Sequence, residues 1–329
     1  MAERDLEEIR SAALAVLKAR AAEFGLGASR LEVGYVLNWG GFVNQSFHVT
    51  DGATKYHLKL ARESGQLKDL AQWRGLHALL NEQYLAPMMV DWIDVPRTRH
   101  AGPLFEFVDG AVPDVRSASL HAAIEPMLAR LHHDAELVSR LAGGGVERQC
   151  LDTFLDTYLD RFVKDMDYVA KAPPPFVERT TLDWMRAEIA QLEHRARTTD
   201  SFADPARSAI HGDLWLNNIL MTDTGRCVVL DWDDLAVGDP AIDWAMFLGP
   251  STRALRPLQM DDLPQSAPRD ASFRQRFAFY ARASLFDWIL DPLADWIDAT
   301  AAPEYAPLVR AEKERVHQAS LGAYLKAYG

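Results

Sequence analysis

The stretch from Ser208 to Trp244 constrains this chain more than any other segment of the sequence. Its 37 residues include seven aspartates and two asparagines, interleaved with Trp, Leu, Ile and Val. A carboxylate among apolar side chains is unfavourable unless a cation or hydrogen-bond donors compensate its charge. The segment must therefore fold so that its acids meet such partners, either in the rest of the chain or in a ligand.

The spacing of the polar residues in this stretch indicates which ligand that is. Asp213 and Asn218 lie five residues apart in a loop after the dipeptide His-Gly, and an apolar strand follows. The turn sequence TDTG joins this strand to a second one that ends at Asp231, so the hairpin brings Asn218 and Asp231 together. Amide and carboxylate oxygens suit Mg²⁺, which usually takes one or two carboxylates together with substrate phosphates. The pattern predicts Asn218 and Asp231 as metal ligands and Asp213 as the catalytic base, as in kinase phosphoryl transfer.

The combined motif is more specific than its parts, because an isolated D-x-x-x-x-N is an ordinary turn sequence. The segments HGDLWLNNIL and VVLDWDDLAVGDPAIDWA together resemble the aminoglycoside phosphotransferase and choline kinase family, the small-molecule relatives of the protein kinases. The resemblance implies an α+β, bilobal protein-kinase-like fold, with a small antiparallel-sheet lobe and a larger, mostly helical lobe. It also implies ATP or GTP as phosphoryl donor and Mg²⁺ as cofactor.

Three further residues of the motif are expected to support the site without reacting. His211 is expected to shape the catalytic loop, residues 211–218, by hydrogen bonding. In the metal motif, residues 231–243, the resemblance implies that Asp243 braces that loop through backbone hydrogen bonds. Asp239 is expected to be structural as well.

Hydrophobic periodicity divides the chain into a sheet-rich part and a helix-rich part. An amphipathic N-terminal helix is followed by strand-like alternation over residues 30–108, interrupted by one helix. From about Ser117 onward, apolar residues recur at three- and four-residue spacing, which is typical of helices. We predict an N-terminal nucleotide-binding lobe over residues 1–108, with a hinge near 104–110. Residues 109–329 are predicted to form a helical lobe that carries the catalytic loop, the metal motif and the acceptor-binding helices.

A phosphate-binding loop and a lysine are expected upstream if the chain is a kinase. Gly40 and Gly41 would let the backbone approach phosphates, and Asn44 or Ser46 would add hydrogen-bond donors. Lys59 lies in the apolar strand YHLKLA, in the place of the lysine that grips the donor phosphates.

The partner of Lys59 departs from the family pattern. The family pairs this lysine with a glutamate of the following helix, whereas the register of that helix here offers Asp69 or Gln72. The missing glutamate favours an alternative in which the chain is a pseudokinase-like module that binds a ligand without turnover.

The segment GPLFEFVDG is predicted to be the interlobe hinge that holds adenine. By position, the backbone carbonyl of Glu106 and the backbone N–H of Val108 would bind the base, and Phe105 would line the back of the pocket. A buried strand that leads into a turn would show the same residues.

The acceptor is expected to bind to the helical lobe and the C-terminal segment. There, aspartates alternate with tryptophans: Asp287, Trp288, Asp291, Asp295, Trp296 and Asp298. Carboxylates and Trp rings suit a cation through charge pairing and cation–π contact, and we assign this role to Asp287, Trp288 and Asp291. An amphipathic helix with inward Trp and outward Asp would show the same pattern. The favoured acceptor is an amino sugar or aminoglycoside-like antibiotic, with choline, ethanolamine, sugars and amino alcohols as alternatives.

Composition argues against several other classes of protein. The net charge of −12 and the pI near 5.3 disfavour nucleic acid and anionic membranes as partners. Cys150 and Cys227 lack metal-site spacing, no stretch approaches about 18 apolar residues, and the N-terminus does not resemble a signal peptide, so a cytoplasmic location is expected.

A two-metal phosphohydrolase usually needs several His ligands, and His211 is the only histidine of the motif. A monomer or homodimer is expected.

Overall fold

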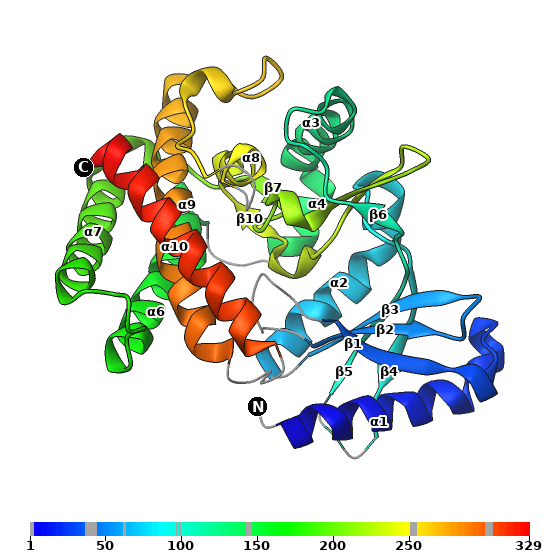
Figure 1. The fold of residues 1–329 in the computed structure, drawn as a ribbon. Helices are drawn as coiled ribbons and strands as arrows, with labels where there is room; N and C mark the ends of the chain where they lie inside the picture. The colour runs from blue at the N-terminus through cyan, green and yellow to red at the C-terminus, as the bar shows by residue number, and fades with distance from the viewer. Residues whose placement is uncertain are drawn as a thin grey trace. The chain divides into compact units, whose positions relative to one another are not determined.

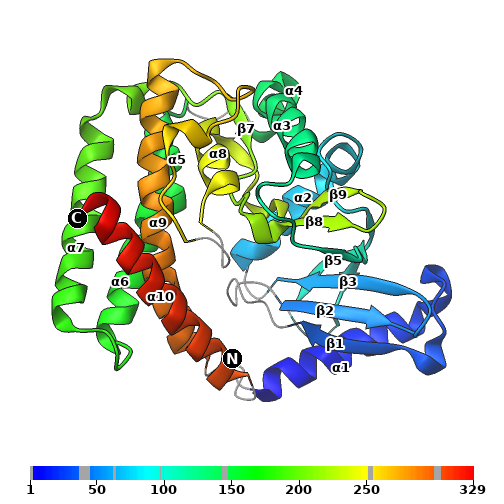
Figure 2. The same cartoon turned by 45° about the horizontal axis from the view of Figure 1, so that its top comes forward.

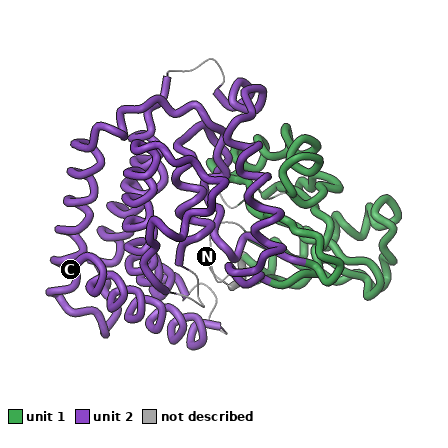
Figure 3. The backbone as a smooth tube through the Cα atoms, turned by 90° about the horizontal axis from the view of Figure 1, so that it is seen from above, with its two compact units in different colours: residues 1–111, 222–233, 301–304 green, residues 112–221, 234–300, 305–329 purple. Residues whose placement is uncertain are grey.

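A five-stranded antiparallel sheet forms most of the first of two units in the computed structural model, which describes residues 3–36, 45–61, 64–96, 98, 100–142, 147–250, 255–299 and 305–329. Unit 1 comprises residues 1–111, 222–233 and 301–304, and unit 2 comprises residues 112–221, 234–300 and 305–329 (Figure 3). The two units are described separately below.

The sheet of unit 1 has the strand order β1-β2-β3-β5-β4, and each pair of neighbours is antiparallel. Its strands are β1 Glu32–Val36, β2 Gln45–Thr50, β3 Lys55–Leu60, β4 Met89–Asp94 and β5 Ala101–Glu106. A turn at Asp51 and Gly52 joins β2 to β3. Asp51 accepts hydrogen bonds from the backbone N–H groups of Ala53 and Thr54, at 2.9 and 2.8 Å, which fixes the register of this hairpin.

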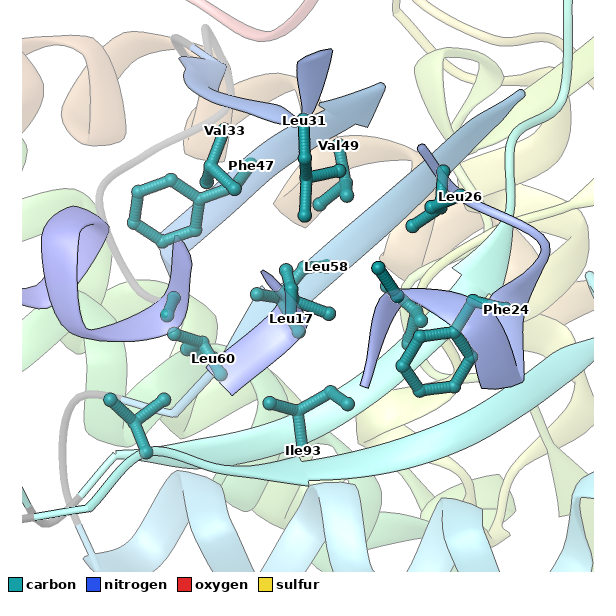
Figure 4. Packing of buried hydrophobic residues seen from close by; sticks show 14 of the residues in the cluster. Leu17, Phe24, Leu26, Leu31, Val33, Phe47, Val49, Leu58, Leu60 and Ile93 are labelled. Atoms are coloured by element: carbon teal, nitrogen blue, oxygen red, sulfur yellow. The ribbon is translucent and has the colours of Figure 1, made fainter. Parts of the chain in front are cut away.

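Two helices cover opposite faces of this sheet. Helix α1, Glu3–Ala19, packs its apolar side on a cluster that includes Leu104 of β5, and helix α2, Ser64–Gln83, contacts β5 through Trp73 and Phe105. Because successive side chains of a strand point to opposite faces, α1 and α2 lie on different sides. The α1 cluster is shown in Figure 4 and includes Leu17, Phe24, Leu26, Leu31, Val33, Phe47, Val49, Leu58, Leu60 and Ile93.

Unit 2 is built mainly from helices. They are α3 Ala118–His133, α4 Ala135–Ala142, α5 Cys150–Phe154, α6 Asp160–Lys171, α7 Arg179–Thr198, α8 Pro240–Leu248, α9 Ala271–Asp298 and α10 Ala306–Tyr328. The long helices α9 and α10 lie side by side (Figure 1 and Figure 2). The short strands β7 Ser208–Ile210 and β10 Ala236–Gly238 pair antiparallel. The short strand β8, Ile219–Thr222, begins in unit 2, whereas the short strands β6, Gly110–Ala111, and β9, Cys227–Val229, belong to unit 1.

The predicted fold class is confirmed, while the division into lobes between residues 108 and 109 remains a prediction. An antiparallel sheet precedes a mostly helical remainder, but residues 109–111 and 222–233 group with unit 1. Hydrogen bonding explains the second difference, because the N–H of Val229 donates to the carbonyl of Leu85 at 2.9 Å. No helix in the described part of the chain is long and apolar enough to cross a bilayer.

Candidate active site

The catalytic loop of unit 2 begins directly after β7 and is held by a carboxylate of α8. The backbone N–H groups of His211 and Gly212 donate to the two oxygens of Asp243, each at 3.0 Å. Gly212 has φ +83°, and a Cβ there would stand 2.6 Å from the carbonyl oxygen of Asp234. Only glycine therefore fits at this position without strain.

Asp243 has a third donor that the sequence did not reveal. The Nε2–H of His132, in α3, donates to Asp243 at 2.9 Å, and both side chains are almost completely buried. A carboxylate without exposure to water is stable here because backbone and imidazole donors surround it. His132 lies in an ordinary amphipathic helix, where its type and spacing carry no signal of this role.

Asp213 and Asn218, the predicted base and metal ligand, are in direct contact. The Nδ2 of Asn218 donates to the backbone carbonyl of Asp213 at 2.9 Å and to its Oδ2 at 2.8 Å. The N–H of Asp213 donates to Nδ1 of His211 at 3.2 Å, so the histidine bonds within the loop as the sequence suggested. Because both amide hydrogens of Asn218 serve Asp213, its amide oxygen is the atom that a cation would take.

Asp239, the remaining acid of the motif in unit 2, begins helix α8. Its Oδ1 accepts from the N–H of Ala241 at 3.1 Å, which is the usual bond of a helix cap. Its Oδ2 lies 2.8 Å from Nε of Arg276. Burial raises the pKa of Asp239 to about 6 even though the guanidinium of Arg276 acts to lower it.

The predicted lysine of unit 1 is buried and bound to the acids that follow β9. The Lys59 side chain is 7% exposed, and its ammonium donates to Asp231 and to Oδ2 of Asp233, the latter at 2.6 Å. Burial lowers the pKa of Lys59, but the two carboxylates outweigh burial and raise it above its ordinary value. Asp231 has φ +61°, a conformation that Asp adopts more readily than most residues.

Helix α2 supplies an aromatic ring beside Lys59. The centroid of Trp73 lies 5.7 Å from the ammonium nitrogen and 4.5 Å from the ring of Phe105. Asp69 and Gln72, the partners predicted for Lys59, are exposed positions of the same helix. In the structure, Asp231 and Asp233 contact the Lys59 ammonium, and the buried face of α2 presents Trp73.

The other predicted nucleotide-binding positions are only partly described. Gly40, Gly41 and Asn44 lie outside the described residues. Ser46 is half-buried in β2, directly opposite Lys59 in the register of β2 and β3.

At the predicted hinge, the Glu106 side chain pairs with Arg226 and accepts from the N–H of Met88 at 2.9 Å. Phe105 is buried against Trp73, and Val108 is half-buried after β5. The side chain of Glu106 therefore anchors the end of β5, while the predicted contacts with adenine involve backbone atoms only.

The predicted acceptor residues lie on α9, and an arginine that the sequence did not reveal stands among them. Arg161 of α6 pairs with Asp287 at 2.7 Å and with Asp291 at 3.4 Å. Burial raises the pKa of Asp287 to about 6, while Arg161 acts to lower it. Trp288 packs edge-to-face on Trp215 of the catalytic loop, with centroids 5.7 Å apart. This contact brings the acidic segment of α9 to the loop that carries Asp213.

The remaining acids and Trp of that segment have structural contacts. Asp295 is buried against Lys313 of α10, and Tyr168 donates to Asp298 at 2.7 Å. The guanidinium of Arg310 lies 4.4 Å from the Trp296 ring. Asp295 is buried and Trp296 is half-buried, so these residues do not follow the simple alternative of an amphipathic helix with inward Trp and outward Asp.

The model of the APH phosphotransferase enzyme family matches residues 35–288. No curated protein sequence matches the chain.

Several solved structures share the fold. The GDP and kanamycin complex of an APH(2") enzyme has a TM-score of 0.58 and 14% identity, over 94% of this chain and 97% of that one. An ethanolamine kinase of Plasmodium vivax has a TM-score of 0.54 and 17% identity, over 91% and 82%. Choline kinase LicA of Streptococcus pneumoniae has a TM-score of 0.54 and 14% identity, over 93% and 98%.

The family match covers well over half of the sequence, and the structural matches are consistent with it. The prediction of an enzyme that transfers a phosphoryl group to an alcohol is confirmed at the level of the family. The chain belongs to the APH phosphotransferase enzyme family.

Proposed function

We propose that this protein is a Mg²⁺-dependent O-phosphotransferase that uses ATP or GTP and acts on a hydroxyl group of a small molecule. The observation that carries the proposal is the pair of Asp213 and Asn218, in which the amide holds the carboxylate and keeps its own oxygen for a cation. Asp243 and His132 fix the backbone of the same loop. Such rigid support is what a catalytic carboxylate requires.

Each residue has a definite part in the reaction. Asp213 accepts the proton of the acceptor hydroxyl while the hydroxyl oxygen bonds to the terminal phosphorus of the donor. The bond between that phosphorus and the nucleoside diphosphate breaks at the same time. Lys59 binds the donor phosphates and stabilises their charge. The oxygens of Asn218 and Asp231 suit Mg²⁺, which when bound neutralises charge on the phosphoryl group. The Asp231 side chain is 33% exposed, so its carboxylate is accessible to a cation.

The donor is bound through the sheet of unit 1. The backbone of Glu106 and Val108 holds the base, while Gly40, Gly41, Asn44 and Ser46 line the phosphates. Support comes from the similar structure that contains GDP.

The acceptor is an amino sugar or an aminoglycoside-like molecule. Asp287 and Asp291 supply two carboxylates against the single guanidinium of Arg161, which leaves a net negative charge near the Trp215–Trp288 pair. Such a site favours cationic ligands. The kanamycin complex supports this choice, and the choline and ethanolamine kinases make amino alcohols the second candidates.

A nucleotide-consumption assay tests the proposal. Purified protein with Mg²⁺ and ATP or GTP is given kanamycin, other amino sugars, choline, ethanolamine and neutral sugars, and nucleoside diphosphate release is followed. We expect release that depends on a cationic acceptor. Asp213→Ala should lower kcat by about 10²–10⁴-fold while nucleotide affinity changes little.

The matched control is Asp223→Ala, which removes an exposed carboxylate from the turn between β8 and β9. It should retain wild-type turnover. Nucleotide binding without acceptor-dependent turnover across the panel would favour the pseudokinase-like module, and full activity of Asp213→Ala would refute the assigned base.

A further inference from the structure

The ammonium of Lys59 is held by an unusual combination of elements within unit 1. Both of its carboxylate partners, Asp231 and Asp233, come from a single short turn after β9, and the helix that follows the lysine strand contributes the Trp73 ring. These two partners have different surroundings. The Asp231 side chain is 33% exposed, whereas that of Asp233 is 14% exposed.

This difference indicates a division of roles. The inference rests on the proposed function, in which a carboxylate oxygen of Asp231 binds the metal ion. The attraction between Asp231 and the ammonium of Lys59 then becomes weaker, because the metal ion neutralises part of the carboxylate's charge. Asp233 is more buried and keeps a direct bond of 2.6 Å to the ammonium. We propose that Asp233 is the positioning residue of Lys59 and that it replaces an acidic residue of α2 in this chain.

The packing of the turn explains how Asp233 can serve as a fixed support. Trp232, between the two acids, is fully buried, and its Nε1–H donates to the carbonyl of Val229 at 2.9 Å. Its ring lies 6.2 Å from that of Tyr84. A residue anchored in this way fixes the backbone of its neighbours, so the carboxylate of Asp233 is directed at β3 by the packed turn.

The ring of Trp73 also lies next to the ammonium, with its centroid 5.7 Å from the Lys59 nitrogen. A cation near the face of an indole ring is attracted by the ring, and the attraction is stronger when water is excluded. Water is largely excluded here, because only 2% of Trp73 is exposed. The lysine is thus oriented by the turn and the ring together. Its alignment does not require a carboxylate from α2, which accounts for an intact lysine site without the family's glutamate.

The experiment compares Asp233→Ala, Asp233→Asn and Asp233→Glu with Asp223→Asn, the same chemical change at the exposed turn of the preceding hairpin. Four quantities are measured: kcat, KM for the nucleotide, the Mg²⁺ concentration at half-maximal rate, and the midpoint of thermal unfolding. A crystal structure of each unliganded variant locates the Lys59 nitrogen without dependence on metal, nucleotide or activity.

We expect Asp233→Ala to lower kcat about 100-fold, because a displacement of the order of 1 Å in a catalytic group has effects of this size. KM for the nucleotide and half-maximal Mg²⁺ should change less than about threefold, and Lys59 should occupy a different position in the unliganded crystals. Asp233→Glu should regain part of the rate that Asp233→Asn loses, and Asp223→Asn should match the wild type.

Other results would overturn the inference. A tenfold rise in the Mg²⁺ requirement of Asp233→Asn with Lys59 unmoved would identify Asp233 as a metal ligand. A lower unfolding midpoint with no change in kcat would identify a structural role only. If the wild type shows no phosphotransfer, the proposed function fails, while an unmoved Lys59 in the unliganded variants refutes the positioning role independently.

Discussion

The catalytic loop of unit 2 and the lysine site of unit 1 both bury carboxylates, but they compensate the charge in different ways. Asp243 accepts hydrogen bonds from two backbone N–H groups and from a ring N–H of His132. Asp231 and Asp233 are bound by the ammonium of Lys59. Donors fixed in the backbone cannot follow a ligand, whereas a lysine can exchange one anion for another. The first arrangement suits a rigid support, and the second suits a site that must accept phosphates and a metal ion.

The largest loss of stability is expected where buried donors lose their acceptor. Asp243→Ala leaves two backbone N–H groups and one imidazole N–H buried without a partner, and each such group costs about 1–3 kcal/mol. We expect the free energy of unfolding to fall by roughly 3–5 kcal/mol in urea denaturation. Asp243→Asn keeps one acceptor oxygen and should lose less. A loss below about 1 kcal/mol for the alanine variant would show that the loop is held by other contacts.

Asp239 combines both kinds of compensation, with a backbone donor and the guanidinium of Arg276, and its effect should depend on pH. Its pKa in the folded chain, about 6, lies above the ordinary value of 3.8. The folded state therefore binds the proton of Asp239 more tightly than the unfolded chain does, and this preference stabilises the fold. The stabilisation is complete below about pH 4 and is lost as the pH rises through 6. The difference between these two pKa values corresponds to about 2–3 kcal/mol in the free energy of unfolding.

The measurement is the free energy of unfolding of the wild type and Asp239→Asn between pH 4 and pH 7. The wild type should lose about 2–3 kcal/mol relative to the variant over this range. Parallel curves would mean that Arg276 compensates the charge of Asp239 completely.

The lysine site should lose less stability and more activity. In Lys59→Met, Asp231 and Asp233 keep partial access to water, so we expect a loss of only about 1–2 kcal/mol in the free energy of unfolding. The value of kcat/KM should fall at least about 10²-fold, because the donor phosphates lose their cation. Addition of Mg²⁺ alone should raise the unfolding temperature of the variant more than that of the wild type, since the carboxylate of Asp231 then binds the ion without competition from Lys59. Equal responses to Mg²⁺ would contradict an exchangeable site.

The same contrast explains what the sequence could predict. The contact between the catalytic loop and Asp243 was expected from the family resemblance, and the sheet-then-helix order of the chain was expected from its hydrophobic periodicity. The partners of Lys59 are 172 and 174 residues away, and the helix register pointed to Asp69 or Gln72 because propensity does not show which face of α2 is buried. His132 and Arg161 lie in amphipathic helices, where a polar residue is ordinarily exposed. Tertiary packing alone selects them.

The smallest effect is expected at the exposed ion pair that links the hairpin to the end of β5. Arg226 pairs with Glu106 through its two terminal guanidinium nitrogens, Nη1 and Nη2, but 47% of its side chain is exposed. Exposed pairs contribute about 0–1 kcal/mol and are screened by salt. Arg226→Gln should therefore lower the free energy of unfolding by less than about 1 kcal/mol, and the difference should vanish in concentrated NaCl. A larger loss that persists in salt would mean that the ion pair, and not the Val229–Leu85 bond or the buried Trp232, attaches residues 222–233 to the sheet.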